Sequence, residues 1–121
     1  MDLSKLADLD YCYLTTTGRK TAEPREIEIC FAAAPAAPDR LYLMAGGRER
    51  AHWVRNILAN PGVSVRIGDV TVAARGRVLT PNTEEDGLAR RLLFEKYEPR
   101  SGRLAAWRDA SLPVALDITQ A

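Results

Sequence analysis

A short segment near the N-terminus, TTTGRKT at residues 15–21, carries the side chains best suited to binding an anion. Hydroxyl, guanidinium and ammonium groups all donate hydrogen bonds to phosphate or carboxylate oxygens. Gly18 allows a tight turn and a close approach of the backbone to a ligand. The segment is therefore either an anion-binding turn or a solvated hairpin tip, and its composition leaves both interpretations open. The candidate anion ligands of the segment and its continuation are Thr17, Arg19, Lys20 and Arg25.

A glycine pair, Gly46-Gly47, offers a second candidate anion site, because it stands between an expected strand and an expected helix. Free backbone N–H groups at a helix N-terminus favour phosphate, and Arg48 and Arg50 add positive charge there. If the fold brings the two turns together, they form a single phosphate pocket. On the helix itself, Trp53 would lie against a flat ring, with Asn56 beside it. The plainer alternatives are a simple turn, a core tryptophan and a surface asparagine.

Other side chains offer little chemistry of their own. His52 is the single histidine, so a histidine-based metal site is excluded and a Ser-His-Asp arrangement would have to be built around a helical residue. Glu26 and Glu28 fit the solvated face of a strand, and the acids at 84–86 fit a helix start, where the dipole favours negative charge. An enzyme built from this chain would therefore depend on a borrowed cofactor, with the protein supplying position and charge.

The overall composition is that of one soluble globular domain over residues 1–121. A formal net charge of +1 argues against a dedicated nucleic-acid-binding protein. No apolar run reaches membrane-spanning length and the polar N-terminus is unlike a signal peptide, so we expect no integral membrane segment and a cytoplasmic location. The two cysteines, Cys12 and Cys30, lack metal-ligand spacing and are expected to be reduced core residues.

Hydrophobic periodicity predicts six strands and two main helices in the order β-β-β-α-β-β-α-β. The strands are expected at 11–17, 26–33, 41–45, in a hairpin across 63–79 and at 112–118, the helices at 48–60 and 81–97, a lead-in helix at 1–9, a helical turn around 104–107, and loops at 18–25 and 34–40. Six short, mostly hairpin-linked strands are hard to cover as a flat sheet under two helices. Closure into a small barrel removes the exposed edges, so the predicted class is α+β with a barrel.

Local signals refine these elements. Gly68-Asp69 suits a two-residue type II′ turn within the long hairpin. Gly76 inside the returning strand indicates a bulge or a close backbone approach. Thr83 followed by Asp86 resembles a capping box at the start of the second helix. The segment 99–102, which begins with proline and ends with glycine, is expected to stop that helix.

Three segments, taken in order, resemble the deazaflavin-dependent nitroreductase family. They are LTTTGRKTAEPR at 14–25, the glycine pair followed by RERAHWVRNILANPGVSVRIG at 48–68, and a tryptophan followed by SLPVALDI within 107–118. The motifs T-T-G-R-K-(S/T)-x-x-P-R and W-x-x-N-(L/I)-x-A-N-P carry the resemblance, which extends from about Tyr11 to Ile118. That family belongs to the split β-barrel, flavin-reductase-like superfamily, which also contains the pyridoxamine-phosphate oxidases.

The resemblance implies a six-stranded antiparallel split β-barrel with two main helices that binds coenzyme F-420, an 8-hydroxy-5-deazaflavin. In this family the reduced coenzyme delivers a hydride to a quinone-like, nitroaromatic or enone acceptor. Basic residues of the first motif hold the phosphate and acidic tail, and helix residues line the tail or ring region. The positions in this chain that match those family residues are Arg19, Lys20, Arg25, Gly46-Gly47, Trp53 and Asn56.

Two departures from the family pattern bear on function. Some relatives have a Ser-Lys pair where this chain has Met44-Ala45, so Arg48 and Arg50 would supply part of the tail-binding charge. Relatives that reduce nitroimidazoles carry several tyrosines near the end of the second helix, where Tyr97 stands here. Tyr97 is then the candidate catalytic residue, as a proton donor to the reduced product.

Alternatives to this function stay open at the level of sequence. The same barrel could bind FMN and act as a flavin oxidoreductase. It could also be a non-catalytic carrier of a flavin-like or lipid ligand, or a structural subunit that binds neither. The wider superfamily further implies a homodimer. The arginine-rich composition fits a GC-rich genome, and coenzyme F-420 is common in actinobacteria.

Overall fold

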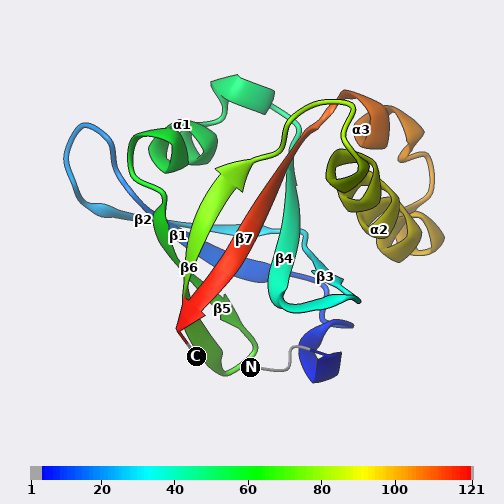
Figure 1. Ribbon diagram of the computed structural model, residues 1–121, viewed down its shortest axis with the longest axis horizontal. Helices are drawn as coiled ribbons and strands as arrows, with labels where there is room; N and C mark the ends of the chain where they lie inside the picture. Colours follow the sequence, from blue (N-terminus) through cyan, green and yellow to red (C-terminus); the bar gives the residue numbers. More distant parts are fainter. Residues whose placement is uncertain (1–3, 121) are drawn as a thin grey trace.

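Seven antiparallel strands form one curved sheet in the computed structural model, which describes residues 4–120 (Figure 1). The strands are β1 (Cys12–Thr17), β2 (Pro24–Ile29), β3 (Ala32–Ala34), β4 (Ala37–Ala45), β5 (Gly62–Ile67), β6 (Val70–Val78) and β7 (Leu112–Gln120). The helices are α1 (His52–Ala59), α2 (Glu84–Ser101) and α3 (Ala105–Ala110), with 3-10 turns at Ser4–Leu6 and Arg48–Arg50. Residues 1–3 of the predicted lead-in helix lie outside the described residues. No described helix is long and apolar enough to cross a membrane.

The strand order β2-β1-β5-β6-β7-β4-β3 places β2 and β3 at the two edges of the sheet. These edges are consecutive in the chain and joined by Cys30 and Phe31, yet no ladder pairs them within residues 4–120. The α+β class is confirmed, but the predicted closed six-stranded barrel is wrong, because the strand predicted at 26–33 is divided and the sheet stays open. Hydrogen bonding explains the division: the Phe31 N–H donates to the Tyr97 hydroxyl (3.0 Å), and its carbonyl accepts from Lys96 (2.9 Å).

Two element boundaries also differ from prediction. The predicted loop at 34–40 is largely strand, because β4 begins at Ala37 and its later residues pair with β7. Pairing between segments this far apart in the chain leaves no local signal in composition. The second helix extends beyond the predicted residue 97, through Pro99 to Ser101, and stops within the predicted segment 99–102, where its cap Gly102 has a φ of 71° that suits a glycine.

Three local predictions are confirmed. The β5–β6 hairpin turns at Gly68-Asp69, where Gly68 has a φ of 58°. The Thr83 hydroxyl accepts a hydrogen bond from the Asp86 N–H (3.2 Å) and caps α2. Gly76 marks a close approach, because a Cβ atom at this position would lie 2.9 Å from Cγ2 of Ile57. Helix α1 can therefore pack against β6 only because position 76 carries no side chain.

The sheet separates the buried apolar side chains into two cores. Alternation along β4 shows the division, because Leu41 and Leu43 face the first core and Tyr42 faces the second. Helix α1 packs into the first core and α2 covers the second, and Figure 1 shows the two helices in different parts of the molecule. Leu58 of α1 points away from this core and is 61% exposed.

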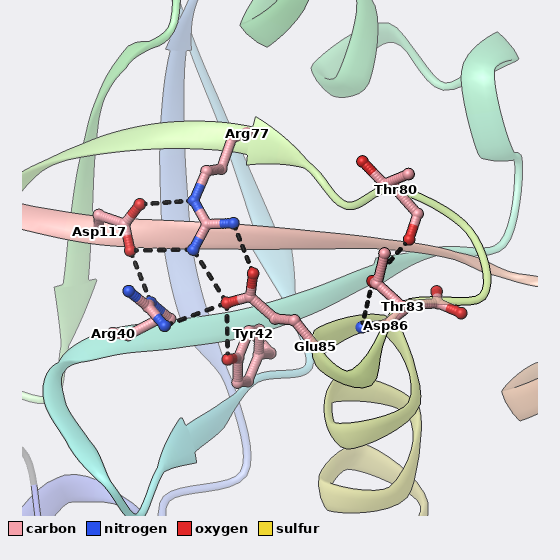
Figure 2. Close-up of polar contacts among 8 residues, drawn as sticks. All are labelled: Arg40, Tyr42, Arg77, Thr80, Thr83, Glu85, Asp86 and Asp117. Atoms are coloured by element: carbon pink, nitrogen blue, oxygen red, sulfur yellow. Dashed lines mark hydrogen bonds and ion pairs between the residues drawn. The ribbon is translucent and has the colours of Figure 1, made fainter.

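An ion-pair network attaches the first turn of α2 to three strands (Figure 2). The Arg77 guanidinium donates to Glu85 (2.7 Å) and to Asp117 (2.7 Å). Arg40 donates to the same two carboxylates at 3.1 Å and 2.7 Å, and the Tyr42 hydroxyl donates to Glu85 (2.9 Å). The hydrogen bond from Arg77 lowers the pKa of Glu85. Burial acts to raise the pKa of Asp117, but its arginine hydrogen bonds outweigh burial and lower it.

The contact at Gly76 predicts a stability effect. Replacing Gly76 with alanine should lower the free energy of unfolding by about 1–3 kcal/mol, because the new methyl group overlaps a branched, buried isoleucine. Urea unfolding followed by tryptophan fluorescence measures the loss. Gly87→Ala is the matched control: nothing lies within 4 Å of a Cβ there, and alanine in a helix should add roughly 0.5–1 kcal/mol. A neutral Gly76→Ala variant would contradict the proposed close packing.

The ion-pair network predicts a pH dependence. Because the pKa of Glu85 is lowered in the folded state, its stabilising contribution is present above the unfolded-state pKa and is lost as the pH falls through the folded-state value. Glu85→Gln should therefore lower the free energy of unfolding by about 1–2 kcal/mol at pH 7. This difference from wild type should close on acidification, as urea unfolding at stepwise lower pH would show. A difference that stays constant down to acid pH would contradict the assignment.

Candidate functional site

The loop between β1 and β2 is a compact turn that depends on Gly18. The Gly18 N–H donates to the Glu23 carbonyl (2.8 Å), and the Ala22 N–H donates back to the Gly18 carbonyl (2.8 Å). A Cβ atom at Gly18 would lie 3.0 Å from the Thr21 hydroxyl oxygen and 3.1 Å from the Glu23 carbonyl oxygen. A larger residue would therefore open the turn. Figure 1 shows this loop beside α1, so the turn fixes where its cations stand relative to the helix.

A cleft of about 670 Å³ lies between the β1–β2 loop and α1. This volume is typical of small-molecule sites, which span roughly 300–1,000 Å³. Three cationic side chains line the cleft, against the single carboxylate of Glu26 among its lining residues. The balance of charge therefore favours an anionic ligand. The predicted site residues that the cleft brings together are Arg19, Lys20, Arg25, Trp53 and Asn56.

Arg19 is held against the wall of the cleft by α1. Its backbone N–H and its Nη1 both donate to Oδ1 of Asn56, at 3.2 Å and 2.9 Å. Its Nη2 lies 3.3 Å from Nδ1 of His52. Asn56 is 3% exposed, and its Nδ2 donates to the Thr16 hydroxyl (3.0 Å). Asn56 is therefore a buried link between β1, the loop and α1, and not the surface residue of the plainer interpretation.

Lys20 and Arg25 are far less restrained than Arg19. Within residues 4–120, the exposed Lys20 side chain has neither a hydrogen bond nor an ion pair. Arg25 lies 3.6 Å from the carboxylate of Glu23, with both side chains more than half exposed. Exposed ion pairs of this kind contribute about 0–1 kcal/mol. Both cations can therefore turn toward an anion in the cleft without giving up a strong contact.

Trp53 both lines the cleft and packs against the first core. Its side chain is half-buried. The two interpretations of Trp53 offered by the sequence, a core residue and a wall for a flat ring, are therefore compatible. A tryptophan fixed by packing on one side presents a rigid surface to a ligand on the other.

Strand alternation decides which threonine belongs to the cleft. Thr16 is buried and lines it, whereas Thr17, the predicted ligand, lies outside it and lines a neighbouring hollow of about 410 Å³. Thr16 is one of the three hydroxyls that the sequence offered to an anion, although Thr17 was the one selected, and His52 is a cleft residue to which the sequence argument gave no ligand role. The signal for Thr16 was available, because it shares the buried face of β1 with Cys12 and Leu14.

The glycine pair Gly46-Gly47 and its two arginines do not line this cleft. The Arg48 guanidinium donates instead to the carbonyl oxygens of Ala110 (2.8 Å) and Ser111 (3.2 Å), and the Arg50 side chain is exposed. The expected single pocket from two turns does not form here, because the glycine pair precedes a separate 3-10 turn and not α1 itself. A role for these four residues in binding a cofactor tail stays a prediction.

Tyr97 also lies outside the cleft, in the second core. Its hydroxyl donates to the Asp10 carbonyl (2.7 Å) and accepts from the Phe31 N–H (3.0 Å), and burial raises its pKa. These contacts give the hydroxyl a structural use, since they fasten two segments of the chain to α2. These contacts do not test the catalytic role as proton donor, which stays a prediction.

The contacts of Arg48 predict an effect on stability. Arg48→Ala should lower the free energy of unfolding by about 0.5–1 kcal/mol, because two hydrogen bonds to backbone carbonyls are lost at a partly exposed site. Arg50→Ala is the matched control from the same turn, since within the described chain Arg50 has no side-chain partner. Urea unfolding of both variants makes the comparison. Equal losses, or none, would contradict the anchoring role.

Several solved structures are similar to this chain. One described as an F-420-H2 dependent reductase is 26% identical with a TM-score of 0.69, covering 92% of this chain and 96% of that chain. One described as a domain-swapped dimer is 27% identical with a TM-score of 0.68, covering 92% and 82%. A putative pyridoxamine 5′-phosphate oxidase from Listeria innocua shares the fold at 14% identity, TM-score 0.69, covering 98% and 90%. Among curated protein sequences, none matches.

The sequence profile of a family described as F-420H(2)-dependent quinone reductase matches residues 3–118, nearly the whole chain. The match confirms the resemblance found in the motifs at 14–25 and 48–68. It also agrees with the neighbour described as an F-420-H2 dependent reductase. The chain therefore belongs to the F-420H(2)-dependent quinone reductase family and is an oxidoreductase that uses coenzyme F-420.

Proposed function

We propose that this enzyme transfers a hydride from reduced coenzyme F-420 to a quinone-like, nitroaromatic or enone acceptor. In this proposal the cleft between the β1–β2 loop and α1 holds the coenzyme's phosphate and acidic tail. The observation that carries it is the convergence of Arg19, Lys20 and Arg25 on one cleft. A family that uses this coenzyme needs a seat for its anionic part, and these side chains supply the charge for one.

The side chains that line the cleft have the charge and the placement needed to bind a phosphate group. Guanidinium and ammonium groups form charge-assisted hydrogen bonds with phosphate, which are stronger than neutral ones. Arg25 has only a weak ion pair, and the Lys20 ammonium has no partner among residues 4–120, so both are available to an anion. Trp53 on the helix side of the cleft offers a rigid aromatic surface beside them. The seat therefore combines cations for a phosphate with a wall for a ring.

In the proposed mechanism the protein contributes position and charge. When bound, the reduced deazaflavin supplies the hydride, which carries two electrons to the acceptor. Arg19, Lys20 and Arg25 anchor the remote phosphate, and that binding energy fixes the orientation of the reacting ring. Water, or the Tyr97 hydroxyl as the sequence predicted, supplies the proton that completes the reduction. No side chain with a strongly perturbed acid or base function is then required.

Absorbance and turnover test the proposed function. Purified protein should be colourless, should quench the fluorescence of added oxidised F-420, and should speed the oxidation of reduced F-420 when a quinone is added. A yellow protein with flavin absorbance bands would favour the FMN alternative. Tight coenzyme binding without oxidation of the reduced form, across quinones, nitroaromatics and enones, would favour a carrier.

Charge removal tests the location of the phosphate seat. Lys20→Ala and Arg25→Ala should each weaken binding of oxidised F-420 by about 1–3 kcal/mol, because each removes a charge-assisted hydrogen bond. Fluorescence titration at several salt concentrations measures this loss, and the salt dependence should become shallower. Arg55→Ala is the matched control, since Arg55 is an exposed cation of α1 that does not line the cleft. Unchanged affinity in both cleft variants would contradict the assignment of the phosphate site to this cleft.

A further inference from the structure

Asn56 occupies an unusual position for a polar side chain. Among the buried residues of α1, which the structure describes in full, it is the polar one beside Val54 and Ile57. A buried amide is costly unless it is hydrogen-bonded. Its oxygen accepts from the backbone N–H and from Nη1 of Arg19, and its Nδ2 donates to the Thr16 hydroxyl.

The chemistry of its partners fixes how the amide points. Arg19 offers only donors at these atoms, so the amide oxygen must face it, and the Thr16 hydroxyl can accept from the amide nitrogen. The oxygen is therefore committed to Arg19. With the side chain 3% exposed, little of Asn56 is left for a ligand to touch.

The restraint on Arg19 has a consequence for binding. An arginine side chain is long and flexible, and fixing it on a ligand costs conformational entropy. Asn56 fixes Arg19 in the free protein, through both its backbone and its guanidinium. A guanidinium carries five N–H donors, so those not used by Asn56 or His52 remain for an anion.

We propose that Asn56 is a positioning residue: it holds Arg19 in the orientation that receives the phosphate, and it acts on coenzyme affinity through Arg19. This inference rests on the proposed function, because it requires the phosphate to meet Arg19. It goes beyond the family resemblance, which places this asparagine simply along the tail or ring region. Lys20 has no comparable restraint among the described residues, so Asn56 should be coupled to Arg19 and not to Lys20.

A double-mutant cycle tests the coupling. Affinity for oxidised F-420 is measured in wild type, Asn56→Ala, Arg19→Ala and the double variant. Asn56→Ala should weaken binding roughly 2- to 12-fold, the effect of leaving one flexible side chain to be ordered on binding. In the Arg19→Ala background the same change should have no further effect, whereas in the Lys20→Ala background its full effect should persist.

Two further measurements separate positioning from a general loss of structure. Asn60→Ala is the matched control, an exposed asparagine just after α1, and should leave affinity unchanged. Side-chain NMR of Arg19 Nε in the free protein should report a rigid guanidinium in wild type and a mobile one in Asn56→Ala. If Asn56→Ala does not fold, Thr16→Val replaces it in the cycle, because a methyl group then takes the place of the hydroxyl that accepts from Nδ2 of Asn56.

The outcomes distinguish this inference from the proposed function. Equal losses from Asn56→Ala with and without Arg19, or an Arg19 side chain equally mobile in both free proteins, would overturn the positioning role and leave the proposed function standing. Failure of the wild-type protein to bind the coenzyme would overturn the proposed function, and the role of Asn56 in coenzyme binding with it.

Discussion

The close approach of α1 to β6 at Gly76 is the constraint on which the cleft depends. Ile57 fills the space that a side chain at position 76 would take, and Asn56 is its neighbour in the helix. With α1 this near the sheet, Asn56 can reach Thr16 at the end of β1 and Arg19 in the following loop. The depth at which α1 packs thus sets the position of Arg19, a cation two residues beyond the end of β1.

Charged side chains are paired differently beside α2 and at the cleft. On the side of α2, charges are paired with one another: Arg40, Arg77, Glu85 and Asp117 join the helix start to three strands (Figure 2). At the cleft, Lys20 and Arg25 have no strong partner in the described part of the chain, which leaves them available to a ligand. Paired charges on one side stabilise the fold, and weakly paired charges on the other favour binding. This division lets the site carry excess positive charge in a chain of nearly balanced composition.

Local signals in the sequence predicted the turns, caps and close contacts of this structure. Features that depend on contacts between distant residues could not be predicted in this way. The hairpin at Gly68-Asp69, the cap at Thr83 and the close approach at Gly76 depend on a few adjacent residues and were foreseen. The break at 30–31 depends on a hydrogen bond that Phe31 donates to Tyr97 and one that it accepts from Lys96. Both partners are more than sixty residues away, so no local pattern could show the break.

The same distinction applies to the cleft. The GRK turn and the helix motif each identified their own residues, and the structure brings them together. The glycine pair at 46–47 was joined to them because a helix was expected to start directly after it, whereas a separate 3-10 turn intervenes. A crystal structure with oxidised F-420 tests the central claim most directly. We expect the phosphate within hydrogen-bond distance of Arg19, Lys20 and Arg25; a phosphate seated at Gly46-Gly47, away from these cations, would contradict the account.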